Sequence, residues 1–196
     1  IEYSTNADFK DSTVKKLTAN KPDTLTISGL TAGYKYYVRV RSYTNVGEKV
    51  YYGAWSDSKN ITTAKYDITK SAISGISTKT YTGKNITQSV KVKYNGKTLK
   101  SGTDYTVSYS SNKKVGTATV KITGKGQYGG TVSKTFKINP AKQKIQKLTA
   151  KSKAFFIDWA QKGSATGYEV QYATNSKFTG AKKLDVANNK TDKMAI

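Results

Sequence analysis

Apolar and aromatic residues alternate with polar residues along most of the chain, in short runs separated by turn residues. The clearest run covers residues 35–41. Its alternating positions are Tyr36, Val38 and Val40 on one face, and Lys35, Tyr37, Arg39 and Arg41 on the other. Because successive side chains of a strand point to opposite faces, this period of two predicts a half-buried antiparallel strand. Comparable runs recur about every ten residues, which is typical of β-sandwiches, so we expect an all-β chain.

Residues 64–140 show the same alternation with tighter turns. Asn95-Gly96 lies between alternating residues and is the strongest short-range signal for a hairpin. The apolar positions that predict strands here are Val90, Val92 and Tyr94; Tyr105, Val107 and Tyr109; Ala118, Val120 and Ile122; and Phe136 and Ile138.

The last stretch of the chain repeats the first. Residues 170–175 match residues 1–6, and Phe178 matches Phe9. The later matches are residues 182–184 with residues 15–17 after a small gap, Met194 with Leu25, and Ile196 with Ile27. An internal repeat of this kind predicts that the chain begins and ends within two copies of one module, with a different module between them.

Residues 30–41 resemble the E–F corner and the F strand of a fibronectin type III domain, and Trp55-Ser56 followed by Thr62-Thr63 resembles its G strand. The resemblance implies that Tyr36 is the corner tyrosine, packed inward with its hydroxyl bonded to a nearby backbone group. Residues 1–63 are then the C-terminal part of such a domain, from strands C and C′ to G. We expect its earlier strands to precede Ile1.

The run from Tyr81 to Ile138 resembles the Ig-like repeats of large surface proteins from anaerobic, Clostridia-type Gram-positive bacteria, which commonly accompany fibronectin type III modules. This resemblance implies an Ig-like domain at residues 64–140. Residues 141–196 resemble the N-terminal part of a second fibronectin type III domain, from strand A to about strand E, with Trp159 as its core tryptophan. We therefore expect tandem antiparallel sandwiches arranged like beads on a string.

The chain has a net charge of +22, from 34 basic and 12 acidic residues, and all of the basic residues except Arg39 and Arg41 are lysines. Lysine is a strongly hydrated point charge, whereas arginine is the better planar reader of phosphates and base edges. The excess charge therefore predicts a solvated surface that keeps sheet edges apart, and secondly attraction to polyanions such as an anionic cell-wall polymer or nucleic acid. It does not indicate sequence-specific recognition of nucleic acid.

Histidine and cysteine are both absent. The sequence therefore offers neither the commonest general base nor a thiolate metal site or disulfide. Asp8, Asp11 and Asp23 have the pattern of loop residues, and no Asp-x-Asp-x-Asp calcium loop is present. We accordingly predict no enzyme activity, no cofactor and no metal site. No apolar run has the length of a membrane helix, so we expect no membrane insertion. The resemblances imply an extracellular bacterial protein.

Tyr37, Arg39 and Arg41 are predicted to share an outward face, with Trp55 close to them in the sheet. One interpretation is a ligand face, on which sugar rings or the bases of single-stranded nucleic acid stack. The other, which we favour, is an internal arginine–tryptophan ladder that braces the F and G strands.

Taken together, these features predict a mechanical function, in which the chain spaces or presents other domains of a bacterial surface or secreted protein. The alternative is an adhesin segment, or an accessory module that binds glycans or the cell wall. A third class is polyanion binding without sequence readout. Incomplete terminal sandwiches would also expose sheet edges, so one copy could complete the next head to tail and form filaments.

Overall fold

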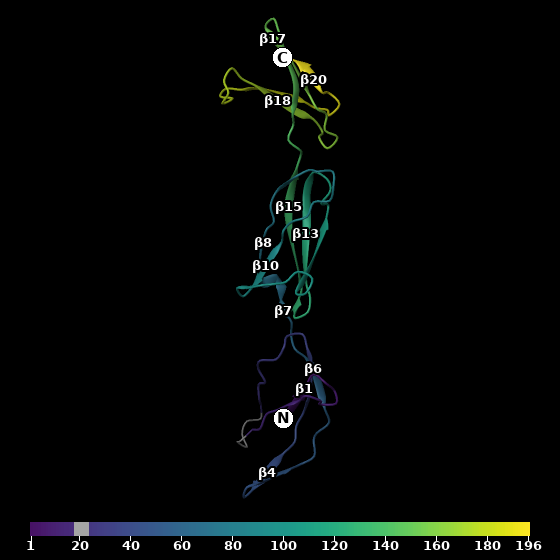
Figure 1. Ribbon diagram of the computed structural model, residues 1–196, viewed down its shortest axis with the longest axis vertical. Helices are drawn as coiled ribbons and strands as arrows, with labels where there is room; N and C mark the ends of the chain where they lie inside the picture. The colour runs from purple at the N-terminus through teal and green to yellow at the C-terminus, as the bar shows by residue number, and fades with distance from the viewer. Residues whose placement is uncertain (18–23) are drawn as a thin grey trace. The chain divides into compact units, whose positions relative to one another are not determined.

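The computed structural model describes residues 1–17 and 24–196 (Figure 1). Asp23, which the sequence places in a loop, lies outside these residues. The described chain consists of β-strands and turns with one short 3-10 segment, η1 (Ile68–Lys70), and contains no α-helix. The predicted all-β class is therefore confirmed.

The chain divides into two compact units, each of which is described by itself. The first comprises Ile1–Ile73, Lys91–Val107 and Ile122–Val132, and the second comprises Ser74–Val90, Ser108–Lys121 and Ser133–Ile196.

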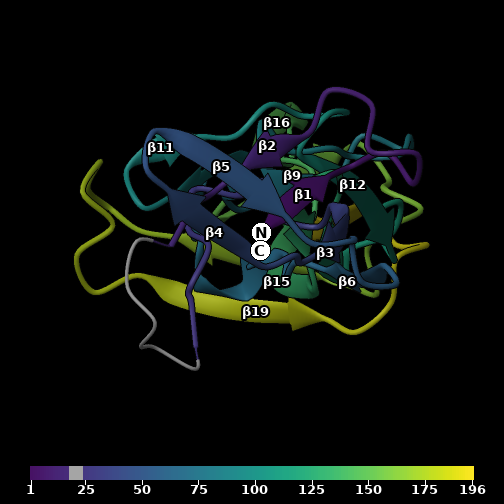
Figure 2. The same cartoon turned by 90° about the horizontal axis from the view of Figure 1, so that it is seen from below.

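The first unit contains a four-stranded antiparallel sheet. Its strands, in sheet order, are β2 (Thr13–Val14), β1 (Glu2–Ser4), β3 (Lys35–Arg39) and β6 (Lys59–Thr62). Beyond β3, strands β4 (Tyr43–Val46) and β5 (Lys49–Tyr52) form a separate antiparallel hairpin (Figure 2). Val40 was predicted to continue the inner face of β3, but it is 52% exposed. The strand ends one residue earlier, at Arg39, and the Val40 backbone N–H donates to the Ser56 hydroxyl.

The first unit also contains short strands from the middle of the chain. They are β7 (Tyr66–Asp67), β10 (Lys91–Tyr94), β11 (Lys97–Thr98), β14 (Tyr128–Gly129) and all but the last residue of β8 (Ala72–Ser74). Strands β10 and β11 pair antiparallel around Asn95 and Gly96, which both adopt positive φ, so the predicted hairpin is confirmed. The rings of Tyr66, Tyr94 and Tyr128 lie 5.5–5.6 Å apart between centroids.

The longest strands of the middle segment belong to one sheet. In sheet order they are β12 (Tyr105–Ser110), β13 (Gly116–Gly124), β15 (Thr131–Asn139) and the short β9 (Lys79–Thr80). Strands β13 and β15 run side by side (Figure 1). The alternation predicted for β13 is confirmed, because Ala118, Val120 and Ile122 are all buried. In the second unit Ala118 packs with Ile86, Phe136 and Ile138 in one apolar cluster.

The remaining strands of the second unit form two sheets. They are β16 (Ile145–Lys151), β17 (Ala154–Trp159) and β20 (Lys193–Ala195) in one, and β18 (Tyr168–Tyr172) and β19 (Lys182–Val186) in the other. Ile157, Trp159 and Val170 form the buried cluster of this region. Trp159, predicted to be a core residue, is only 3% exposed.

Two strand pairs depart from the predicted antiparallel arrangement. Strand β7 pairs parallel with β14 in the first unit, and β9 pairs parallel with the end of β15 in the second. In both pairs the partners are separated by more than 50 residues of chain. This is ample for the crossover of about a dozen or more residues that a parallel pair requires. Alternation alone does not specify strand direction, so this feature could not be read from the pattern.

The terminal repeat is reproduced in local geometry. Asn6 and Asn175 each begin a turn in which the side-chain oxygen accepts a backbone N–H two residues later. Phe9 and Phe178 close these turns with positive φ values of 58° and 54°, which are uncommon for residues other than glycine. The same strained turn therefore occurs at matching positions of the two copies, which supports the sequence repeat.

The strand pairing also corrects one detail of the repeat. Tyr3 faces Thr13 across its strand pair, and the matching Tyr172 faces Lys182. Lys182 therefore corresponds to Thr13 rather than to Lys15, and no gap is needed between the two copies. A run of lysines was a poor anchor for the alignment, because exposed lysines occur throughout this chain.

Candidate functional site

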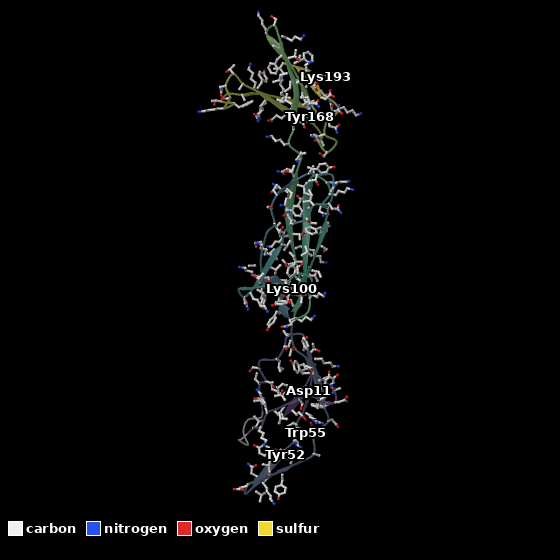
Figure 3. All side chains as sticks on the ribbon, in the orientation of Figure 1. Asp11, Tyr52, Trp55, Lys100, Tyr168 and Lys193 are labelled. Carbon is white, nitrogen blue, oxygen red and sulfur yellow. The ribbon has the colours of Figure 1, made fainter. Side chains whose placement is uncertain are left out.

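The candidate site lies at one face of the sheet in the first unit. Strand β3 supplies Arg39, Arg41 follows the end of that strand, and Trp55 precedes β6. The guanidinium carbons of Arg39 and Arg41 lie 4.7 Å and 4.2 Å from the centroid of the Trp55 ring system. The tryptophan is thus stacked against two cations, and Figure 3 shows its side chain in the same region as Tyr52.

Two further rings extend this stack. Phe9 lies 4.1 Å from the Arg39 guanidinium carbon, and Tyr52 lies 3.9 Å from that of Arg41. The positive φ of Phe9 turns its side chain back over the sheet, whereas Tyr52 comes from the end of β5. Each guanidinium therefore contacts two aromatic rings. We call this series the arginine–aromatic ladder, and its members in order are Phe9, Arg39, Trp55, Arg41 and Tyr52.

A buried carboxylate holds the Arg39 step in place. Glu2 is directly opposite Arg39 in the sheet and is 8% exposed. Its Oε2 accepts a charge-assisted hydrogen bond from Arg39 Nε at 2.6 Å, and its Oε1 accepts a bond from the Ser12 hydroxyl. The hydrogen bond from Ser12, followed by the bond and the charge of Arg39, lowers the pKa of the Glu2 carboxyl below its usual value of 4.5.

Acid is therefore expected to weaken this part of the chain. A depressed folded-state pKa stabilises the fold fully above the unfolded value, and this stabilisation is lost as the pH falls through the folded pKa. Glu2→Gln should remove part of the fall in unfolding free energy between neutral and strongly acidic pH, measured by urea denaturation at a series of pH values. Glu48→Gln, on the exposed turn of the β4–β5 hairpin, should leave the profile unchanged. An acid profile of Glu2→Gln that matches the parent protein would contradict this role.

Three of the four residues predicted to form a ligand face are brought together. Arg39, Arg41 and Trp55 form the centre of the ladder, as the bracing interpretation requires. Tyr37 is not a member, since its ring is stacked with the Lys35 ammonium at 5.2 Å. Ligand binding by this face stays a prediction.

Sequence reasoning missed four participants, namely Glu2, Phe9, Lys16 and Tyr52. Lys16 Nζ lies over the ring of Tyr52, at 5.6 Å from its centroid. One of the four carried a usable signal: Phe9 has a counterpart in the terminal repeat, which indicated a fixed position in a turn. Glu2 carried no such signal, because its partners Arg39 and Ser12 lie 37 and 10 residues away in the chain.

A second bracing contact lies at the corner that precedes β3. Tyr36 is 8% exposed, and its hydroxyl oxygen accepts a hydrogen bond from the Thr31 backbone N–H at 3.0 Å. The inward packing and the backbone bond expected of the corner tyrosine are both present. The Thr63 hydroxyl donates to the Thr31 carbonyl at 2.6 Å, so both polar backbone groups of Thr31 are used.

Tyr36→Phe is expected to lower the free energy of unfolding by about 1–2 kcal/mol, because the part-buried Thr31 N–H loses its acceptor while the ring packing is retained. Chemical denaturation followed through the Trp55 indole resonance measures this loss. Tyr34→Phe, at an exposed neighbouring position, is the matched control and should cost less than about 0.5 kcal/mol. Equal costs for the two variants would mean that the corner bond does not stabilise the unit.

Comparison with protein-family models, curated proteins and solved structures found no match to this chain. In residues 1–17 and 24–196, no helix has the length and apolar character needed to cross a membrane.

Proposed function

We propose that the chain is a non-enzymatic spacer segment of a bacterial cell-surface or secreted multidomain protein, built from fibronectin type III modules on either side of an Ig-like module. In this function it extends, spaces or presents other domains. In this function the sheets belong to β-sandwich modules, and the side chains of the arginine–aromatic ladder brace one of these sheets.

The repeated turn carries this proposal. The same asparagine-initiated turn, closed by a phenylalanine with positive φ, occurs at Asn6–Phe9 and at Asn175–Phe178, with a different β segment between them in sequence. Tandem repetition of small β modules is how extended surface proteins gain length. The ladder supports the same function, because its aromatic rings and guanidinium groups stack on one another within the chain and so brace the sheet.

Single-molecule force spectroscopy on the 196-residue chain tests the spacer function. If residues 64–140 form an independent module, its unfolding adds roughly 25 nm of contour length, because an extended residue spans at most about 3.6 Å. We expect that increment as a separate force peak. A gradual extension without a peak of that size would contradict an independent, force-bearing middle module.

We further propose that copies of the chain associate end to end. Strand β16 is at the edge of its sheet and carries the exposed residues Ile145 and Leu148. The same unit has an apolar hollow of ≈490 Å³ that reaches the core residues Ile157, Trp159 and Val170. Exposed edges and apolar faces are templates for pairing with another chain. Light scattering at rising concentration should show growing species, and a constant monomer mass would exclude this association.

The alternative function is an adhesin segment or a glycan- or wall-binding accessory module. Tyr52, at one end of the ladder, is exposed and stacked with Lys16, which favours this alternative. A glycan array with the parent protein and Trp55→Phe separates the two functions. Clean hits that this variant loses would replace the spacer function, whereas a blank array supports it.

A further inference from the structure

A small hollow lies at the Arg41 end of the ladder, entirely within the first unit. Its volume is ≈90 Å³. Its lining combines basic and aromatic residues with aliphatic ones, namely Lys15, Lys16, Arg41, Tyr43, Tyr52 and Trp55 with Ile1, Val14, Leu17 and Val40. Pockets for drug-sized molecules typically have about 300–1,000 Å³. The hollow is therefore too small for a sugar ring, but it has room for one oxyanion.

Arg41 is held in a fixed plane by two stacked rings. Trp55 and Tyr52 cover the two faces of its guanidinium, at 4.2 Å and 3.9 Å from the ring centroids. Within the described part of the chain, no acceptor makes a hydrogen bond or ion pair with Arg41, whereas Arg39 gives its Nε to Glu2. A guanidinium immobilised by stacking loses little side-chain entropy when its edge binds a phosphate group in bidentate fashion.

Two lysines add positive charge at the same hollow. The Lys16 ammonium lies 5.6 Å and 5.8 Å from the ring centroids of Tyr52 and Tyr43, and a hydrogen bond to Tyr52 raises its pKa, so it stays protonated at neutral pH. Lys15 lines the hollow without belonging to the ladder. The nearby Glu2 carboxylate is already paired with Arg39 and Ser12. The lining of the hollow therefore includes three positively charged residues, namely Lys15, Lys16 and Arg41.

We propose that this hollow binds one phosphodiester group of an anionic polymer, with Arg41 as the bidentate donor and Lys15 and Lys16 as the flanking charges. The net charge of +22 supplies the long-range attraction that brings such a polymer to the surface. A glycerol phosphate chain fits best, because it places no ring beside the phosphate that enters the hollow. This binding does not depend on the spacer function, and a test of this site neither supports nor contradicts that function.

Titration of the full chain with poly(glycerol phosphate) tests the proposal. Calorimetry measures the Kd, and the NMR signal of the Arg41 side chain reports whether that residue takes part in binding. Lys15→Gln and Arg41→Gln should each raise the Kd about tenfold or more, since each removes a charge-assisted bond to phosphate. Lys49→Gln removes the same charge from the exposed β4–β5 hairpin and should raise the Kd less than about twofold. Lys15→Gln leaves every ladder contact in place, so its effect does not depend on the folding of the Arg41 variant.

Three results would overturn the proposal. The first is an equal loss of affinity in Lys15→Gln and Lys49→Gln, which would show that only total charge matters. The second is a titration in which the Arg41 side-chain signal does not shift. The third is tighter binding of heparin, matched for charge, with the same dependence on Lys15 and Arg41, which would assign the hollow to sulfate esters on sugar rings.

Discussion

Trp55→Ala is expected to lower the free energy of unfolding of the first unit by about 3 kcal/mol. Truncation of a packed tryptophan costs about 3–5 kcal/mol, and Trp55 belongs at the lower end of this range because it is partly exposed. This figure includes the cation–π attraction that Arg39 and Arg41 lose, which is about 0.5–1 kcal/mol for each guanidinium. Arg39 and Arg41 then have no ring between them, so two like charges face each other across the gap.

Chemical denaturation at neutral pH, monitored through the backbone amide NMR signals of β3, measures this loss of unfolding free energy. Trp55→Phe keeps a ring between the two arginines and should recover at least half of the stability. Tyr51→Ala removes an aromatic ring that is 57% exposed in the neighbouring hairpin, and should cost less than about 1 kcal/mol. If Trp55→Ala cost no more than Tyr51→Ala, the ladder would not brace the sheet, and its stacked geometry would need another explanation, such as ligand binding.

Alternation predicted the strands and their buried faces because it reports a local property of the chain. The burial of Tyr36 and of Ala118, Val120 and Ile122 in β13 follows from period-two spacing around turns, whereas the burial of Trp159 was expected from the family resemblance. The same logic failed at Val40, where the strand ends and the pattern continues for one more apolar residue. The pattern therefore identified which residues enter a core, but not where each strand stops.

The candidate site was only partly predictable because its members come from separate elements. Arg39 and Arg41 are two residues apart in one run, so their shared face was evident from spacing. Phe9 reaches the ladder from a turn with positive φ, and Tyr52 reaches it from the β4–β5 hairpin. Which turn or hairpin folds over a sheet depends on tertiary packing, and no short-range pattern encodes it.

Gly75→Ala is expected to be the most damaging single-methyl substitution in the second unit, at a cost of about 4 kcal/mol. Gly75 has a φ of +80°, which costs a residue with a side chain about 1–2 kcal/mol. A Cβ atom there would lie 1.9 Å from the carbonyl oxygen of Ser89 and 2.9 Å from its carbonyl carbon. Both are backbone atoms, so one of the two segments must move, and forced shifts of this kind typically add about 1–3 kcal/mol.

Gly83→Ala provides a matched control for this prediction within the same unit. Gly83 has nearly the same φ, +76°, but an added Cβ would meet the Tyr81 hydroxyl oxygen at 3.9 Å, which is an ordinary contact distance. It should therefore cost only the 1–2 kcal/mol of backbone strain, and the difference between the variants isolates the close approach of Gly75 to Ser89. Denaturant melts of both proteins, with hydrogen exchange at the buried amides of β13, measure that difference. Equal costs would mean that the segment around Ser89 moves to accommodate a methyl group. The packing around Gly75 would then be too loose to support the force-bearing middle module proposed above.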